Sequence, residues 1–141
     1  MTKKEFLNQY LNAQKEIGIK LDQIAKLREL STKITQTLTP DKVKSNSDNR
    51  LESSVSKIVD MEREIGASLD KLEKVRLQVE NAISSMKNEN LRRILEMHYI
   101  NGYSFEQIAV KEHYSYRHAT RLHGIALQQL QIDKCVLECP Y

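Results

Sequence analysis

Residues 114–123, YSYRHATRLH, contain two arginines, two histidines and two tyrosines but no carboxylate. No Asp or Glu occurs anywhere between Glu112 and Asp133, although the chain has 19 acidic residues. Arginine side chains bind phosphate groups and can hydrogen-bond the edges of bases, whereas a neighbouring acid would repel a polyanion. The segment is therefore a candidate surface for nucleic acid. The alternative is an ordinary solvent-exposed helix whose charge balance is accidental.

Arg117 and Arg121 are four residues apart, so they share one face of a helix. We predict that these two arginines reach bases or backbone in a major groove. The helix N-terminus adds favourable partial positive charge for a phosphate. Hydrogen bonds to phosphate are expected from the hydroxyl groups of Ser115, Tyr116 and Thr120. His118 and His123 are expected to line or flank the same face.

Two short helices with a tight turn between them would hold this surface. Ser104 with Gln107 has the spacing of a capping box for a helix over residues 105–112, and Ser115 is a good N-cap for a helix over 116–130. A preceding amphipathic helix over 91–99 should end at Asn101-Gly102, where glycine accepts the left-handed conformation. The pattern predicts a helix-turn-helix. The residues expected to pack at or beside the helix crossing are Ile108, Ala109, Tyr114, Ala119, Leu122, Ile125, Ala126 and Leu130.

Residues 95–130, LEMHYINGYSFEQIAVKEHYSYRHATRLHGIALQQL, resemble region 4 of bacterial sigma factors. They are more similar to small phage and prophage regulators of Gram-positive bacteria, of the RinA and ArpU kind. The resemblance implies double-stranded DNA binding and control of phage genes, including late genes, with Arg117, Thr120 and Arg121 in the reading helix. Glu112 stands where the family usually has Leu, and His113 where it usually has Gly. Glu112 is expected either to leave that edge less well covered or to pair with a neighbouring Arg.

Two long amphipathic helices are expected before this domain. The first has an apolar seam and should stop at Thr39-Pro40-Asp41, and residues 42–50 read as a loop. The second follows a heptad pattern that is broken at Glu62 and Arg76, which either set the register or extend to the rim; we favour the rim. The predicted seams are Phe6, Tyr10, Ala13, Ile17, Leu21, Ile24, Leu27, Ile34 and Leu38, then Leu51, Val55, Ile58, Ile65, Leu69, Leu72, Val79, Ile83 and Met86.

The expected fold is therefore all-α, with an antiparallel helical hairpin over residues 1–87, a helix-turn-helix domain over 88–134 and a loose tail over 135–141. Each long helix buries its stripe against the other or against a second copy, and a homodimer through these helices is expected. No export signal or apolar run long enough for a membrane span is evident, so we expect a cytoplasmic protein with reduced Cys135 and Cys139 and no membrane partner.

No catalytic residue, cofactor or metal site is expected. The chain has no Gly-rich phosphate loop and no nucleophile with an obvious base, and the spacing of its Cys and His residues matches no zinc finger. Three functional hypotheses remain. The first is a DNA-binding transcriptional regulator of phage or prophage genes. The second is a helical module that grips RNA polymerase or a sigma factor with little direct DNA contact. The third is a small terminase-like packaging component.

Overall fold

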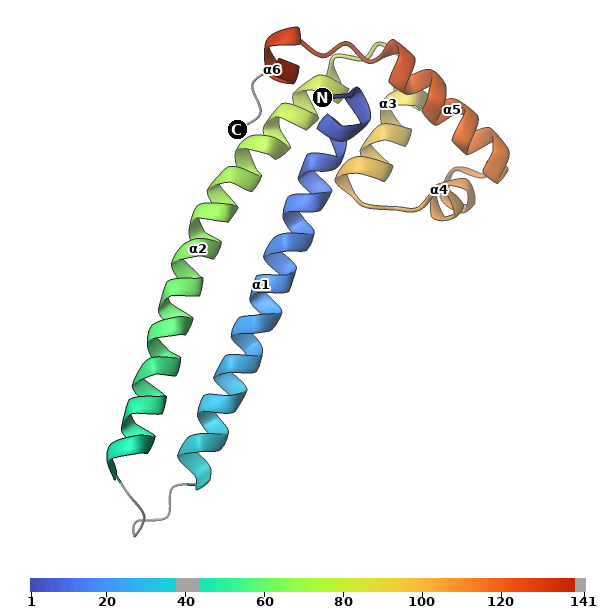
Figure 1. Ribbon diagram of the computed structural model, residues 1–141. Helices are drawn as coiled ribbons and strands as arrows, with labels where there is room; N and C mark the ends of the chain where they lie inside the picture. Colours follow the sequence, from blue (N-terminus) through green and yellow to red (C-terminus); the bar gives the residue numbers. More distant parts are fainter. Residues whose placement is uncertain (38–43, 139–141) are drawn as a thin grey trace. The chain divides into compact units, whose positions relative to one another are not determined.

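The computed structural model describes the backbone of residues 1–37 and 44–138, and the side chains of residues 1–33, 49–134, 136 and 137. Every regular element in these residues is helical, which confirms the predicted all-α class. Figure 1 shows the helices in chain order. They are α1 (Lys3–Thr37), α2 (Lys44–Ser84), α3 (Glu89–Leu95), the π-helical turn η1 (Glu96–Ile100), α4 (Phe105–Glu112), α5 (Tyr116–Gln129) and α6 (Lys134–Glu138).

The chain divides into two compact units that do not follow one another in sequence. One unit, here called the terminal unit, combines residues 1–13 with residues 72–141, and the other, the hairpin unit, comprises residues 14–71. Each long helix contributes one part to each unit. The predicted division of the chain at residues 87 and 134 stays a prediction.

In the hairpin unit, α1 and α2 run antiparallel (Figure 1). Their buried and half-buried residues form a seam with a seven-residue repeat. Ile17, Ile24 and Ile65 are buried in it. Half-buried residues complete the seam at three- and four-residue steps: Lys20, Leu27 and Ser31 on α1, and Ser54, Ile58, Met61 and Ser68 on α2. The predicted intramolecular alternative, in which the two helices cover each other's stripes, is thus observed in this unit.

Three predicted seam residues are not buried between α1 and α2, because Leu21, Val55 and Leu69 are 52%, 50% and 48% exposed, and their burial against a second copy stays a prediction. On α2 the seam uses the residue just before each of the predicted positions 55, 62 and 69. This choice places the uncharged Met61 in the seam instead of Glu62, and so avoids burying a carboxylate. On α1 the seam position falls on Lys20, whose aliphatic stem can pack while its ammonium group lies 3.5 Å from the Ser68 hydroxyl.

The two charged residues that interrupted the predicted heptads lie at the rim of their helices. Glu62 is exposed and forms an ion pair with Arg28 in the hairpin unit. Arg76, in the terminal unit, pairs with Glu80 one turn further along α2 at 2.8 Å. Neither side chain is enclosed by the seam, so the favoured interpretation as rim residues is confirmed.

The described part of the hairpin unit has a thin core. Its three buried isoleucines contribute about 1.5–3 kcal/mol each on burial. Half-buried seam residues add to this contribution, but the described apolar burial is small for two helices of this length.

The predicted loop over residues 42–50 is wrong for its larger part, because α2 already begins at Lys44. Ser, Asn and Asp residues such as those of this segment favour loops, but the same residue types are also favoured at the start of a helix. The predicted stop at Thr39-Pro40-Asp41 and the predicted seam residue Leu38 lie outside the described residues.

The terminal unit has a larger core, which gathers residues from both ends of the chain. Phe6, Leu7 and Tyr10 of α1 share a buried cluster with residues of α2, α3, η1 and α5. Those partners are Val75, Val79, Ile83, Met86, Leu91, Leu95, Tyr99, Ala126 and Leu130. The first residues of the chain therefore belong to the same core as the helix that carries the arginines.

The predicted loose tail over 135–141 is wrong in its first part. Residues Lys134–Glu138 form the short helix α6, and Val136 and Leu137 pack against the core of the terminal unit. The partial burial of these two apolar side chains stabilises the helix. The prediction of a loose tail took only the cysteines of this segment into account. Cys139 lies outside the described residues, as does the side chain of Cys135.

Within the described residues, no helix is both long enough and apolar enough to cross a membrane.

Candidate nucleic-acid interface

A wide π-helical turn, η1, follows α3. The amide of Asn101 donates to the carbonyl of Glu96 at 3.1 Å, which is the five-residue step of a π-helix. Gly102 follows with φ 75°, the left-handed conformation predicted for it. Ser104 then caps α4, because its hydroxyl accepts from the Gln107 amide while the Gln107 side chain accepts from the Ser104 amide. The predicted capping box is confirmed.

The turn between α4 and α5 is left-handed at one residue. His113 adopts φ 56° and ψ 38°, the left-handed conformation that glycine would take more readily. Ser115 caps α5 by accepting from the amide of His118 at 3.2 Å. Glu112 pairs with Arg93 at 3.1 Å, which is the second of the two outcomes expected for this departure from the family pattern. The hydrogen bond from Arg93 to Glu112 raises the pKa of the arginine.

A small apolar core fixes how α5 is rotated about its own axis. Ile108 and Ala109 of α4 and Ala119 of α5 are buried together with Ile94 and Met97, and Tyr114 and Leu122 pack against them. The predicted packing positions at the crossing are confirmed. On the same side of α5, Ala126 and Leu130 are buried in the larger core. With Ala119, Ala126 and Leu130 inside, the residues between them that lie on the other side of α5 face solvent.

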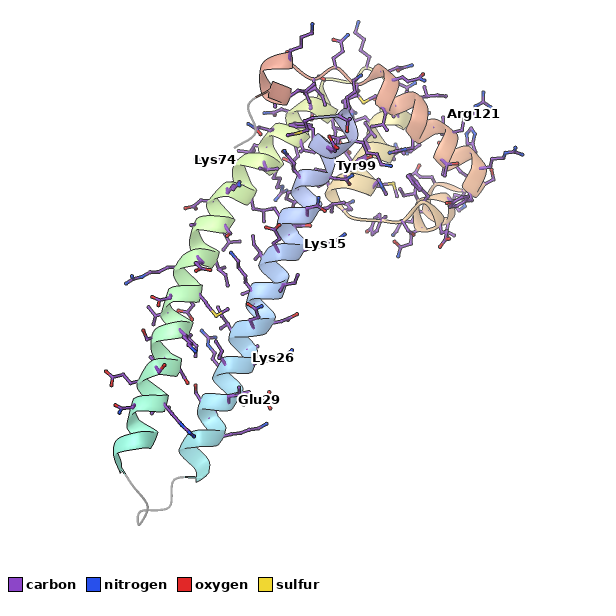
Figure 2. All side chains as sticks on the ribbon, viewed as in Figure 1. Lys15, Lys26, Glu29, Lys74, Tyr99 and Arg121 are labelled. Carbon is purple, nitrogen blue, oxygen red and sulfur yellow. The ribbon has the colours of Figure 1, made fainter. Side chains whose placement is uncertain are left out.

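The exposed side of α5 carries the predicted site residues. Arg117, His118 and Arg121 are exposed, and Tyr116 is 55% exposed. Arg121 projects away from α5 in Figure 2, whereas Tyr99 points inward. Among the described residues, no carboxylate lies within ion-pair distance of Arg117 or Arg121. Both guanidinium groups are therefore available to an external anion.

Two predicted site residues have local partners that limit what they can do. The Thr120 hydroxyl donates to the carbonyls of Tyr116 and Arg117 at 3.2 and 2.9 Å, so in this rotamer its proton points back at the helix. An external phosphate would meet the Thr120 oxygen only after this hydroxyl rotates. The His118 ring packs edge-on against Tyr114 with centroids 4.9 Å apart, which leaves the ring at the edge of the exposed face.

His123 is not at the interface, and the prediction that it lines or flanks the DNA face is wrong. Its side chain is 8% exposed, and its Nε2 lies 2.9 Å from the hydroxyl of Tyr99. Phe105 and His98 enclose the ring, with centroids 4.9 and 5.5 Å away. Burial lowers the pKa of His123 to about 4, with a smaller contribution from His98. The sequence contained the signal, because residues 119, 123, 126 and 130 follow helical three- and four-residue steps.

His98 is stacked on Phe105, with ring centroids 4.4 Å apart. Its Nδ1 lies 2.8 Å from the carbonyl oxygen of Tyr103, so the ring also ties η1 to the segment before α4. Across the described residues, no three His, Cys, Asp or Glu side chains gather closely enough to hold a metal ion.

Lys3 makes a contact with the end of α5 that the sequence did not predict. Its ammonium group donates to the carbonyls of Leu127 and Gln128 at 3.1 and 3.3 Å, in the last turn of α5. A cation at this position satisfies free carbonyl groups and complements the negative end of the helix dipole. The helix that carries Arg117 and Arg121 is thus held at its far end by a residue 124 positions away in the chain.

Comparisons of the chain with protein-family models, with curated proteins and with solved structures find no match. The sigma-like resemblance consequently rests on the residues of 95–130 themselves.

Proposed function

We propose that this chain is a sequence-specific regulator that binds double-stranded DNA with α5. The observation that supports this best is the exposed, carboxylate-free side of α5, on which Arg117 and Arg121 stand one turn apart without an ion-pair partner among the described residues. The resemblance of residues 95–130 to sigma region 4 supports regulation of phage or prophage genes. The protein acts as a homodimer, so that two copies read two half-sites about one helical turn of DNA apart, or a multiple of that distance.

In this proposal α5 lies in the major groove with its N-terminus toward the phosphate backbone. Arg117 and Arg121 hydrogen-bond base edges, with guanine as the preferred base for a bidentate arginine contact. Ser115 and Tyr116 lie at the first turn, where backbone amides and the helix dipole favour a phosphate. His118 contacts the DNA at the edge of the exposed side of α5. Thr120 hydrogen-bonds a phosphate after its hydroxyl turns outward.

The test is selection from a random pool of double-stranded DNA with the full chain. Three proteins are compared: the parent, the Arg117→Glu/Arg121→Glu variant and a Lys15→Glu/Lys26→Glu control. The control changes the net charge by the same amount, but its two lysines lie on α1 far from α5 in sequence and are exposed. Far-UV circular dichroism establishes that all three are folded.

The proposal expects the parent and the control to enrich the same motif, and the arginine variant to enrich none. Enrichment by all three proteins would remove α5 from the interface. Enrichment by none would leave the chain without a DNA-reading function. Loss of enrichment in the control as well would indicate that overall charge, rather than α5, drives binding.

A second candidate is the protein-binding module that grips RNA polymerase or a sigma factor. One observation favours it: Val110 of α4 is 77% exposed, an unusual position for a large apolar side chain. Binding through such a surface weakens little with salt, whereas binding through phosphate contacts weakens steeply. Co-purification with RNA polymerase that persists at high salt, survives Arg117→Glu/Arg121→Glu and is lost with Val110→Glu would favour this candidate.

A further inference from the structure

One side of the hairpin unit carries a continuous line of exposed residues outside the seam. The Arg28 guanidinium forms an ion pair with the Glu62 carboxylate, so these two side chains lie on the same side of the helix pair. Leu21 precedes Arg28 by seven residues, and Val55 and Leu69 lie seven residues on either side of Glu62. Seven residues are two helical turns, so all five share that side. We call Leu21, Arg28, Val55, Glu62 and Leu69 the lateral face.

The lateral face is apolar to a degree that is unusual for a helix side in water. Leu21, Val55 and Leu69 are each about half exposed, and Val59, one turn from Val55, is exposed as well. In the same unit the described core contains three buried isoleucines. Among the described residues, the hairpin unit thus leaves four large aliphatic side chains about half exposed on this side and fully buries three in its seam. Exposed apolar side chains gathered along one side of a helix pair favour a contact with another molecule.

The charges on the lateral face indicate which molecule covers it. The face contains one cation, Arg28, and one anion, Glu62, at the same level of the helix pair. A nucleic acid would find no excess of positive charge here. A second copy of the same face, turned about a two-fold axis, would instead bring Arg28 of one chain to Glu62 of the other. A two-fold contact requires such self-complementarity, because the same patch is used twice.

We propose that two copies of this chain pack through their lateral faces and form a four-helix bundle. The inference rests on the homodimeric regulator proposed above, for which it names the contact surface. Each hairpin then has two apolar seams, one within the chain and one between chains, as in bundles assembled from helix pairs. The heptad line through residues 55, 62 and 69 has its place in the interface between the two copies.

The first test measures the oligomeric state of the full chain by sedimentation velocity at micromolar concentration. The parent should be a dimer, and Leu21→Gln/Leu69→Gln should raise its dissociation constant at least tenfold. The matched control is Ile19→Gln/Leu30→Gln. Both control residues are exposed and apolar, but each is two positions from a residue of the lateral face and therefore points to another side of α1. Circular dichroism checks that each variant remains helical.

The second test separates contacts between chains from contacts within a chain. Arg28→Glu makes both charges of the lateral face negative, and Glu62→Arg makes both positive. Each variant alone should dimerise at least tenfold more weakly than the parent. An equimolar mixture of the two variants should form a heterodimer at near-parental affinity, which a solely intramolecular ion pair cannot produce.

The inference is overturned if the parent is a monomer. It is also overturned if the Ile19→Gln/Leu30→Gln control dissociates while the Leu21→Gln/Leu69→Gln variant remains a dimer. Failure to form the heterodimer overturns the proposed meeting of Arg28 with Glu62 of a second copy. The DNA selection described above decides the proposed function separately. If the protein is a monomer and still enriches a single half-site, the result supports DNA reading and contradicts the four-helix bundle. If the protein dimerises through the lateral face and enriches no DNA, the result supports the bundle and contradicts DNA reading.

Discussion

The hydroxyl oxygen of Tyr99 and Nε2 of His123 lie 2.9 Å apart inside the terminal unit, two residues beyond the exposed Arg121. Burial raises the pKa of Tyr99 to about 12 and lowers that of His123 to about 4. Both side chains are therefore uncharged at neutral pH, and one hydrogen bond satisfies two buried polar groups. This pair joins η1 to α5 and helps to set the direction in which the arginines point.

The His123 pKa predicts how stability depends on pH. The unfolded chain binds a proton at His123 below its ordinary pKa of 6.5, whereas the folded protein does not until about pH 4. The stability associated with neutral His123 is thus fully present above pH 6.5 and is lost as the pH falls to 4. We expect this residue to lower the free energy of unfolding by about 2–3 kcal/mol over that interval. Urea denaturation at several pH values measures it.

The Tyr99→Phe/His123→Leu variant is the matched comparison, because it removes both partners and leaves no buried group unsatisfied. Its stability should depend on pH less steeply than that of the parent between pH 6.5 and 4. The exposed His118 provides the control, since His118→Gln should retain the parental slope. Equal slopes in the parent and the double variant would show that His123 does not titrate with a lowered pKa.

The two left-handed positions should respond to substitution in opposite directions. His113→Gly should raise the free energy of unfolding by about 0.5–1 kcal/mol, because glycine adopts φ 56° without steric strain. Gly102→Ala should lower it by about 1 kcal/mol at φ 75°. The added Cβ would be only 3.5 Å from the nearest carbon of Leu11, an ordinary contact, so the backbone conformation accounts for the cost. Thermal denaturation distinguishes the signs, and a stabilising Gly102→Ala would contradict the account.

Ala119 should tolerate no larger side chain. It is completely buried where α4 and α5 cross. Ala119→Leu should destabilise the protein by about 1–3 kcal/mol, because the close helix contact has no room for three more carbons. Ala67→Leu, at an exposed position of α2, should change the free energy of unfolding by less than about 0.5 kcal/mol. Denaturant titration of both variants tests the difference, and an equally small effect at residue 119 would mean that the crossing is loosely packed.

Arg121→Lys separates base reading from phosphate binding under the proposed function. Lysine keeps the charge but lacks the bidentate fork of arginine. We expect the variant to retain the dependence of affinity on salt while its preference for the selected site over a scrambled site falls by about 1–2 kcal/mol. Binding titrations at several salt concentrations supply both quantities. Unchanged discrimination would assign Arg121 to a phosphate.

The parts of the fold that depend on neighbouring residues were predictable from the sequence. Three local features depend only on residues within a few positions in the sequence: the capping box of Ser104 with Gln107, the left-handed Gly102 and the N-cap Ser115. Each residue adopts the conformation that its type favours. The sequence alone does not determine which residues of α2 lie in the seam. Met61 and Glu62 both fit a heptad step, and only packing against α1 decides between them. The prediction for His123 was wrong because a histidine in a basic segment suggested an anion-binding role. The spacing of His123 from Ala119 and Ala126 indicated burial instead.

Lys3 shows what a sequence pattern cannot supply. Nothing in its neighbourhood relates it to Leu127 and Gln128, since the contact depends on how residues far apart in the chain fold together. The location of the candidate site was predicted from its charge pattern, whereas the support behind it became apparent only with the three-dimensional structure.

The contact of Lys3 with α5 also bears on the order of events during synthesis. Residues 3, 6 and 7 have some of their partners at 126–130, which are made more than a hundred residues later. Residues 14–71 can form their helices and their seam in the meantime, because the ion pairs of Lys20 with Glu64 and of Arg28 with Glu62 join residues of this unit. The apolar side chains at the start of α1 therefore lack part of their cover until residues 126–130 have been made. A nascent chain that stalls before residue 126 would have only the cluster residues of α2, α3 and η1 to cover Phe6 and Leu7, without Ala126 and Leu130.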